Sequence, residues 1–117
     1  MNIQERTEKF AVRVIKAYTE LMKRSYDDAG KVLAKQFLRS GTSIGANCAE
    51  AVYAQSRNDM ISKYSIALKE ASETNYWIKI MIESELILQQ KFNPMQEELI
   101  SIIKILTSII NKLKDGK

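Results

Sequence analysis

Apolar residues recur every three or four positions along nearly the whole 117-residue chain, which is the spacing of one face of an α-helix. No stretch alternates apolar and polar residues as a half-buried strand does, and the chain contains no internal repeat. It holds a single proline, and the connectors between the periodic segments are short. The sequence therefore predicts an all-α protein built from long amphipathic helices.

Four helices follow from this period. The first three are predicted over about residues 4–24, 29–54 and 57–90, and a fourth begins at Pro94. Because short connectors join antiparallel neighbours, we expect one domain, residues 1–117, folded as an up-down-up-down four-helix bundle.

Polar residues mark where these helices begin. One aspartate of the pair at 27–28 is expected to cap the second helix, and Ser56 with Asp59 resembles a capping box before the third. Asn93 followed by Pro94 predicts a cap and a first helical position for the fourth helix.

The composition excludes several classes of site. The chain has no histidine and one cysteine, Cys48, so zinc sites and histidine-dependent catalytic groups are excluded. The lone thiol fits a reducing compartment, and no export signal or long uncharged apolar run is present. We expect a cytoplasmic protein that is not an enzyme, needs no cofactor or metal, and has no membrane partner.

The third and fourth helices are apolar beyond a single stripe. Their additional large side chains are Ile66, Trp77, Ile80, Ile87, Ile100, Ile105 and Ile109. A wide apolar face marks either an interface between copies or a helix that packs against two neighbours within one bundle. We favour self-association, with packing inside the bundle as the alternative.

The second helix carries a stripe of small residues, Gly41, Gly45 and Ala49, spaced four apart. An interior glycine costs roughly 1 kcal/mol relative to alanine, so its presence needs a reason. A smooth stripe predicts a close helix crossing, and a ligand-facing groove is the alternative.

Polar residues form a ridge beside this stripe and a second ridge on the third helix. The two ridges are Arg39, Ser43, Asn47 and Glu50 on the second helix and Glu70, Glu73, Thr74 and Trp77 on the third. If they face each other, Arg39 pairs with Glu70 or Glu73, and Asn47 bonds across the seam. A structural network is favoured over an acid–base cluster of the three glutamates, because no nucleophile or cofactor motif accompanies them.

The same residues carry a family resemblance. "RSGTSIGANCAEA", followed by "IALKEASETNYWIKI", resembles the small bacterial four-helix-bundle family typified by proteins encoded in intervening sequences of large-subunit ribosomal RNA genes. The resemblance covers about residues 8–110. Its most specific positions are Arg39, Ser43, Ile44, Asn47, Ala49, Glu50, Ala67, Glu70, Glu73 and Trp77.

The resemblance implies a homopentameric ring with an axial channel. Many members have no assigned biochemical role. The related accessory variability proteins of diversity-generating retroelements bind a reverse transcriptase and nucleic acid through basic surfaces, but no feature of this chain places it in that branch.

The positive charge is concentrated in the first third of the chain. Residues 1–39 hold nine Lys/Arg and five Asp/Glu, whereas residues 40–117 hold nine of each. A candidate nucleic-acid-binding ridge follows the first helix and extends onto the second. Its members are Arg6, Lys9, Arg13, Lys16, Lys23, Lys31 and Lys35.

Two functions remain open on this sequence. The first is a homo-oligomer that binds structured RNA or another polyanion, such as DNA, through the basic ridge by contacting backbone and shape, since no aromatic residue interleaves with the cations. The second is an oligomeric adaptor or scaffold that docks a protein partner, with the charge serving solubility. We favour the first.

Overall fold

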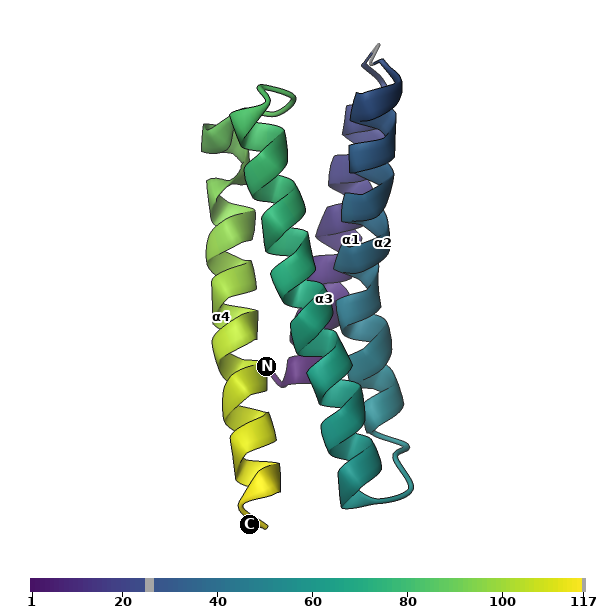
Figure 1. Ribbon diagram of the computed structural model, residues 1–117, viewed down its shortest axis with the longest axis vertical. Helices are drawn as coiled ribbons and strands as arrows, with labels where there is room; N and C mark the ends of the chain where they lie inside the picture. Colours follow the sequence, from purple (N-terminus) through teal and green to yellow (C-terminus); the bar gives the residue numbers. More distant parts are fainter. Residues whose placement is uncertain (25–26, 117) are drawn as a thin grey trace.

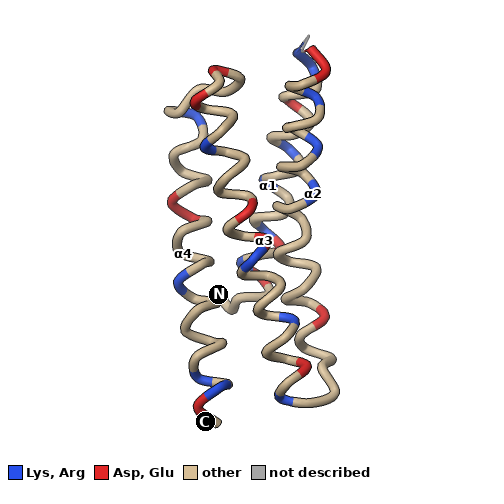
Figure 2. Tube along the Cα trace, viewed as in Figure 1, with Lys and Arg blue, Asp and Glu red and all other residues tan. Residues whose placement is uncertain are grey.

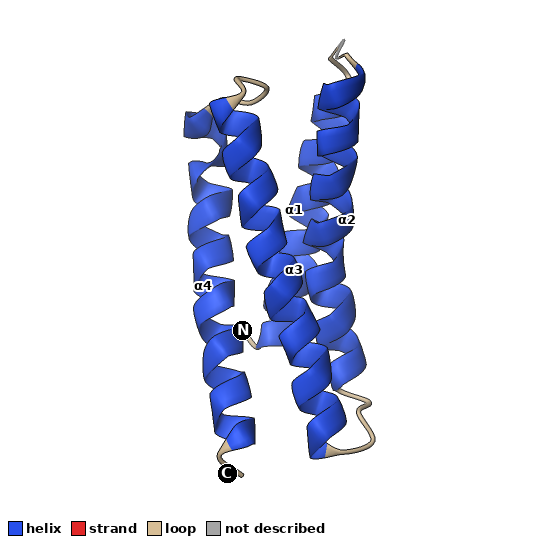
Figure 3. Cartoon of the chain, viewed as in Figure 1, coloured by secondary structure: helices blue, strands red, loops and turns tan. Residues whose placement is uncertain are grey.

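The computed structural model describes residues 1–24 and 27–116, which form a bundle of 49 × 22 × 22 Å. All of its regular structure is helical, and the described residues contain no strand (Figure 3). The helices are α1 (Ile3–Met22), α2 (Asp28–Ala51), α3 (Arg57–Glu83) and α4 (Gln89–Lys114). The predicted all-α four-helix bundle is therefore confirmed.

Each helix packs against two others, so the four stand at the corners of a square. α2 contacts α1 and α3, while α4 contacts α3 and, less extensively, α1. Figure 1 shows the chain running up α1, down α2, up α3 and down α4, and it places the N-terminus about midway along α4. The lower part of the bundle is therefore built by α2, α3 and α4.

The core follows the predicted apolar faces. On α1, Phe10, Val14 and Leu21 follow the helical period and are buried, and Tyr18 of the same face is half-buried. The other large side chains with almost no exposed surface are Phe37, Ile44, Ile78, Met81, Leu99, Ile102 and Leu106. Burying these side chains supplies most of the driving force for folding.

The extra apolar side chains of α3 and α4 pack mainly within the bundle. Ile87 is buried, Trp77, Ile80, Ile105 and Ile109 are half-buried, and Ile66 and Ile100 are exposed. Other exposed large apolar side chains are spread over several elements. They include Val12 and Ile15 on α1, Val32 on α2, Val52 and Tyr53 after α2, Tyr76 on α3 and Leu88 before α4.

The first three helices end earlier than predicted. α1 ends at Met22 rather than near residue 24. α2 ends at Ala51 rather than near residue 54, and α3 ends at Glu83 rather than near residue 90. After α3, Glu85 takes a left-handed conformation (φ 64°), and the Leu86 amide donates to the Met81 carbonyl (2.9 Å). This is a Schellman arrangement with glutamate where glycine is usual, so the sequence offered no glycine signal for the helix end.

Two predicted caps are present in the structure, at the starts of α2 and α3. The Asp27 carboxylate accepts from the Gly30 amide (3.0 Å), and the Ser56 hydroxyl accepts from the Asp59 amide (3.0 Å). Asp59 in turn accepts from the Gln55 amide (3.2 Å). The side chains at the starts of α2 and α3 thus satisfy amide groups that the helix itself leaves unpaired.

The predicted start of the fourth helix is wrong. α4 begins at Gln89, with Leu88 as its cap residue, and Pro94 lies inside the helix. The reason is burial: Phe92 and Met95 both enter the core, and the Phe92 ring meets Phe37 edge-on at a centroid distance of 6.1 Å. Continuing the helix upstream places these side chains on the same face as the rest of the core.

Pro94→Ala is expected to raise the free energy of unfolding by about 1 kcal/mol, because the new amide can donate to the Gln90 carbonyl one turn earlier. Chemical denaturation monitored by circular dichroism measures this change. If Pro94 instead occupied the first helical position, where its missing amide is harmless, the same substitution would give no gain.

Candidate functional surfaces

Arg39 joins α2 to α3 through two carboxylates. Its guanidinium donates to Glu70 (Nη1–Oε2, 3.2 Å) and to Glu73, and the Trp77 indole donates to the same Glu73 carboxylate (3.2 Å). The sequence predicted one of the two glutamates, and the structure brings both together on one cation. The Arg39 side chain remains half-exposed, so this network lies at the surface of the α2–α3 seam.

The other ridge residues do not extend that network. Ser43 and Asn47 donate to backbone carbonyls of their own helix, at residues 39 and 43 respectively, both at 2.8 Å. The expected bond from Asn47 across the seam is therefore wrong, because the Asn47 side chain donates instead to the Ser43 carbonyl one turn earlier on its own helix. Glu50 pairs with Lys63 (3.4 Å) rather than joining Glu70 and Glu73.

A buried hydroxyl pair links the same two helices, and the sequence analysis missed it. The Ser40 and Thr74 hydroxyl oxygens are hydrogen bonded at 2.9 Å, and both side chains are fully buried. The sequence pattern groups Thr74 with the polar ridge, but its spacing of three from Ala71 and four from Ile78 puts it on the buried face of α3. Only the relative rotation of α2 and α3, which the sequence does not give, brings the two hydroxyls together.

Gly41 and Gly45 lie at the α1–α2 crossing. A Cβ atom added at Gly41 would stand 2.8 Å from both Val14 methyl groups, and one added at Gly45 would stand 3.0 Å from the Thr7 carbonyl oxygen. These glycines therefore let α1 approach α2 closely. Ala49, the third member of the stripe, is exposed and is not covered by α1.

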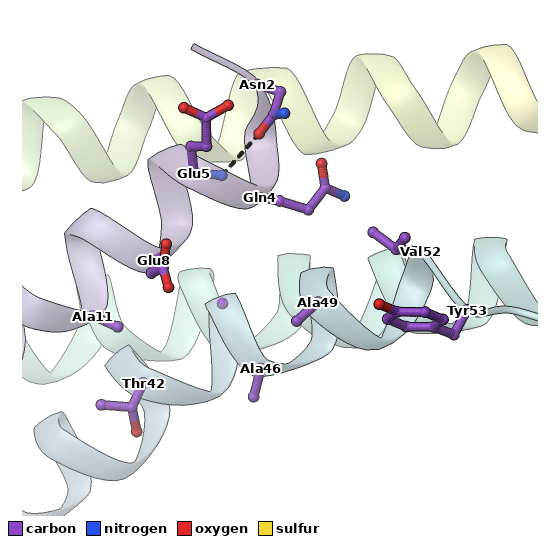
Figure 4. Close-up of a pocket in the computed structure, with 11 residues that line it drawn as sticks. Asn2, Gln4, Glu5, Glu8, Ala11, Thr42, Ala46, Ala49, Val52 and Tyr53 are labelled. Atoms are coloured by element: carbon purple, nitrogen blue, oxygen red, sulfur yellow. Dashed lines mark hydrogen bonds between the residues drawn. The ribbon is translucent and has the colours of Figure 1, made fainter.

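Ala49 borders an open groove of about 480 Å³ between α1 and α2 (Figure 4). Small side chains from both helices form much of its lining, and Val52 and Tyr53 stand at one end. Tyr53 is 85% exposed. The small-residue stripe thus continues from a helix crossing into one side of this groove, whose α1 side carries the polar residues Gln4, Glu5 and Glu8.

Five of the seven predicted basic residues form no ion pair with another described residue. Lys9, Arg13 and Lys16 project from α1 and are exposed. Figure 2 shows Lys and Arg along the upper part of the α1–α2 pair. The other two unpaired cations are Lys31 and Lys35.

The remaining two basic residues are already paired. Arg6 holds Glu98 of α4 in a two-pronged contact (Nε–Oε2 2.8 Å and Nη2–Oε1 2.9 Å), and Lys23 pairs with Glu20 at 2.8 Å. Arg6 lowers the pKa of the Glu98 carboxyl by hydrogen bonding, as Lys23 does for Glu20. Their charges are therefore partly compensated within the chain.

The basic ridge does not continue from α1 onto α2 as predicted. Arg13 lines three hollows of about 290, 340 and 390 Å³ along the α1–α4 seam, so the ridge faces α4. The helical period places Lys31 and Lys35 on the face of α2 that holds Thr42 and Ala49, which borders the opposite flank of α1. The cations thus form two separate surfaces.

No helix among the described residues combines the length and apolarity needed to cross a membrane. Within the same residues, no group of three or more Cys, Asp or Glu side chains is arranged to hold a metal ion.

Comparison with known proteins identifies the family. A family model described as "23S rRNA-intervening sequence protein" matches residues 1–108. The chain is also similar to a crystal structure from Bacteroides thetaiotaomicron, a protein of unknown function from the S23 ribosomal protein family, with 42% identity and a TM-score of 0.85. That match covers 93% of this chain and 98% of the other. No curated protein matches. The chain belongs to the 23S rRNA-intervening sequence protein family.

Proposed function

We propose that this chain is a non-enzymatic, homo-oligomeric helical module that binds structured RNA or another polyanion through the α1 face that holds Lys9, Arg13 and Lys16. These three cations carry the proposal, because they follow one another along a single helix face and form no ion pair with a described residue. A row of unpaired cations gains free energy from a phosphate backbone by releasing its counterions.

The chemistry of this face favours the backbone over the bases. The hollows beside Arg13 include Phe10 and Phe92, but both rings are buried in the core and offer no open face for stacking on a base. Lysine and arginine contacts to phosphate position a nucleic acid without reading its sequence. We therefore expect the protein to distinguish nucleic acids by shape.

Self-association is the second part of the proposal. Val52 and Tyr53 line the α1–α2 groove and are 56% and 85% exposed. Ile15, which is 48% exposed, lies one turn from Ala11 on the α1 face that borders this groove. Apolar side chains gathered on one surface are typical of an interface. A ring, pentameric as the family resemblance implies, would repeat the basic face in each protomer and multiply the phosphate contacts. The same groove supports the alternative of an adaptor that docks a protein partner.

A salt titration of the purified, nuclease-treated protein tests the proposal. Fluorescence anisotropy would follow binding to an RNA hairpin and to a DNA duplex of matched sequence between 50 and 300 mM salt (about the range in which phosphate contacts are screened). Three phosphate contacts predict that log K falls against log salt with a slope of about −2 to −3, and more steeply if several protomers touch one RNA. Negligible binding at the lowest salt would overturn the nucleic-acid proposal and favour the adaptor.

A further inference from the structure

One hollow on the α1–α4 seam concentrates positive charge around a single carboxylate. Its volume is about 390 Å³, and it is lined by three cations, Arg6, Lys9 and Arg13, and by Glu98, which pairs with Arg6. Met1 and Phe10 supply the rest of its lining. Three positive side chains and one negative side chain leave the hollow with an excess of positive charge.

Glu98 occupies the position in which an external anion would be bound. The Arg6 guanidinium offers two parallel N–H groups to its oxygens at 2.8 and 2.9 Å, and this planar fork fits a carboxylate and a phosphate equally well. Arg13 also acts electrostatically on Glu98, in the same direction as Arg6. The side chains of Arg6 and Glu98 keep 31% and 23% of their surface exposed, so solvent ions reach them.

We propose that this hollow is a phosphate-binding subsite and that Glu98 is its built-in competitor. Glu98 holds Arg6 in the geometry that a phosphate group would use and neutralises it in the free protein. Lys9 and Arg13 then make the first contacts with a polyanion, and Arg6 contributes only when Glu98 is displaced. This inference rests on the proposed function, because it assigns a role to residues within the same basic face.

Glu98→Gln tests the inference because it removes the competing charge while keeping an amide oxygen that can accept from Arg6. One additional phosphate contact is expected to raise the affinity for an RNA hairpin about five- to eightfold at 0.1 M salt, and to steepen the salt slope by about 0.7–0.9. Glu8→Gln is the matched control. It makes the same change in net charge on the opposite flank of α1, in the lining of the α1–α2 groove.

Arg6→Gln in the Glu98→Gln background gives the second measurement. It should abolish the whole gain, because it removes the guanidinium that Glu98→Gln frees for phosphate. Lys69→Gln in the same background is the control, since it removes the same charge from an exposed position on α3, and it should leave most of the gain. A gain that depends on Arg6 in this way is the signature of competition for one guanidinium, and a general change in charge would not produce it.

The inference is overturned if Glu98→Gln and Glu8→Gln change affinity and slope equally, or if Arg6→Gln and Lys69→Gln reduce the gain of the Glu98→Gln protein equally. The wild-type salt titration would still stand in that case, so the proposed function survives. If the wild-type protein itself does not bind RNA, the proposed function and this inference both fail. Thermal unfolding of each variant checks that α1 remains docked on α4. Glu98→Ala, which removes the same charge, replaces Glu98→Gln in the titrations if the glutamine variant is unstable.

Discussion

Gly41→Ala is expected to lower the free energy of unfolding by about 2 kcal/mol, the usual scale for inserting a methyl group into a closely packed contact. In a solvent-exposed helix the same change would raise stability by about 1 kcal/mol, so the sign is reversed. The reason is the α1–α2 crossing, where the new Cβ atom would stand 2.8 Å from both methyl groups of Val14. Val14 is fully buried, so its methyl groups cannot turn away into solvent.

Two further variants test that cause by urea denaturation. Ala46→Gly, on the exposed side of the same helix, should lower stability by about 1 kcal/mol through helix propensity alone. Val14→Ala should cost about 2 kcal/mol alone, but in the Gly41→Ala protein it should cost at least 1 kcal/mol less, because it removes the clashing methyls. A Gly41→Ala protein more stable than wild type would show that the helices do not cross closely there.

Side-chain periodicity predicted the fold because each helix buries one face. The apolar positions of α1, α2 and α4 identify the core directly, and the glycine spacing on α2 predicts a close helix crossing, for which the structure shows α1 as the partner. The start of α4 could not be predicted in the same way. Asn93 and Pro94 form a strong local start signal, but burial of Phe92 and Met95 outweighs the lost hydrogen bond and carries the helix through the proline.

The candidate sites were less predictable, because they depend on how the helices are rotated and placed. Periodicity placed Arg6 and Lys9 on one ridge, but it could not show that Glu98 of α4 lies opposite Arg6 and compensates it. It also could not show that the α2 face holding Lys31 and Lys35 borders the flank of α1 that lies away from α4. The pairing of Arg39 was easier to predict. Glu70 and Glu73 lie one turn apart on α3, so at least one of them reaches Arg39 over a range of helix rotations.

Replacing Lys9, Arg13 and Lys16 together by glutamine is expected to weaken RNA binding at least 100-fold at 0.1 M salt, if each residue neutralises one phosphate. The salt slope should fall by about 2 to 3 at the same time. The three side chains are exposed and form no ion pair with a described residue, so the substitution should leave the fold unchanged. Circular dichroism and thermal unfolding would verify this.

The matched control is the triple glutamine variant of Lys69, Lys79 and Lys104, which are exposed on α3 and α4. It removes the same net charge from other faces, so it should reduce affinity several-fold through the long-range field while leaving the slope nearly unchanged. A third variant, Lys31→Gln with Lys35→Gln, separates the two flanks of α1. If it weakens binding as much as the α1 variant does, RNA crosses α1 rather than following the α4 seam. Equal losses in the first and control triple variants would instead mean that net charge alone attracts RNA, and the α1 face would then have no specific role.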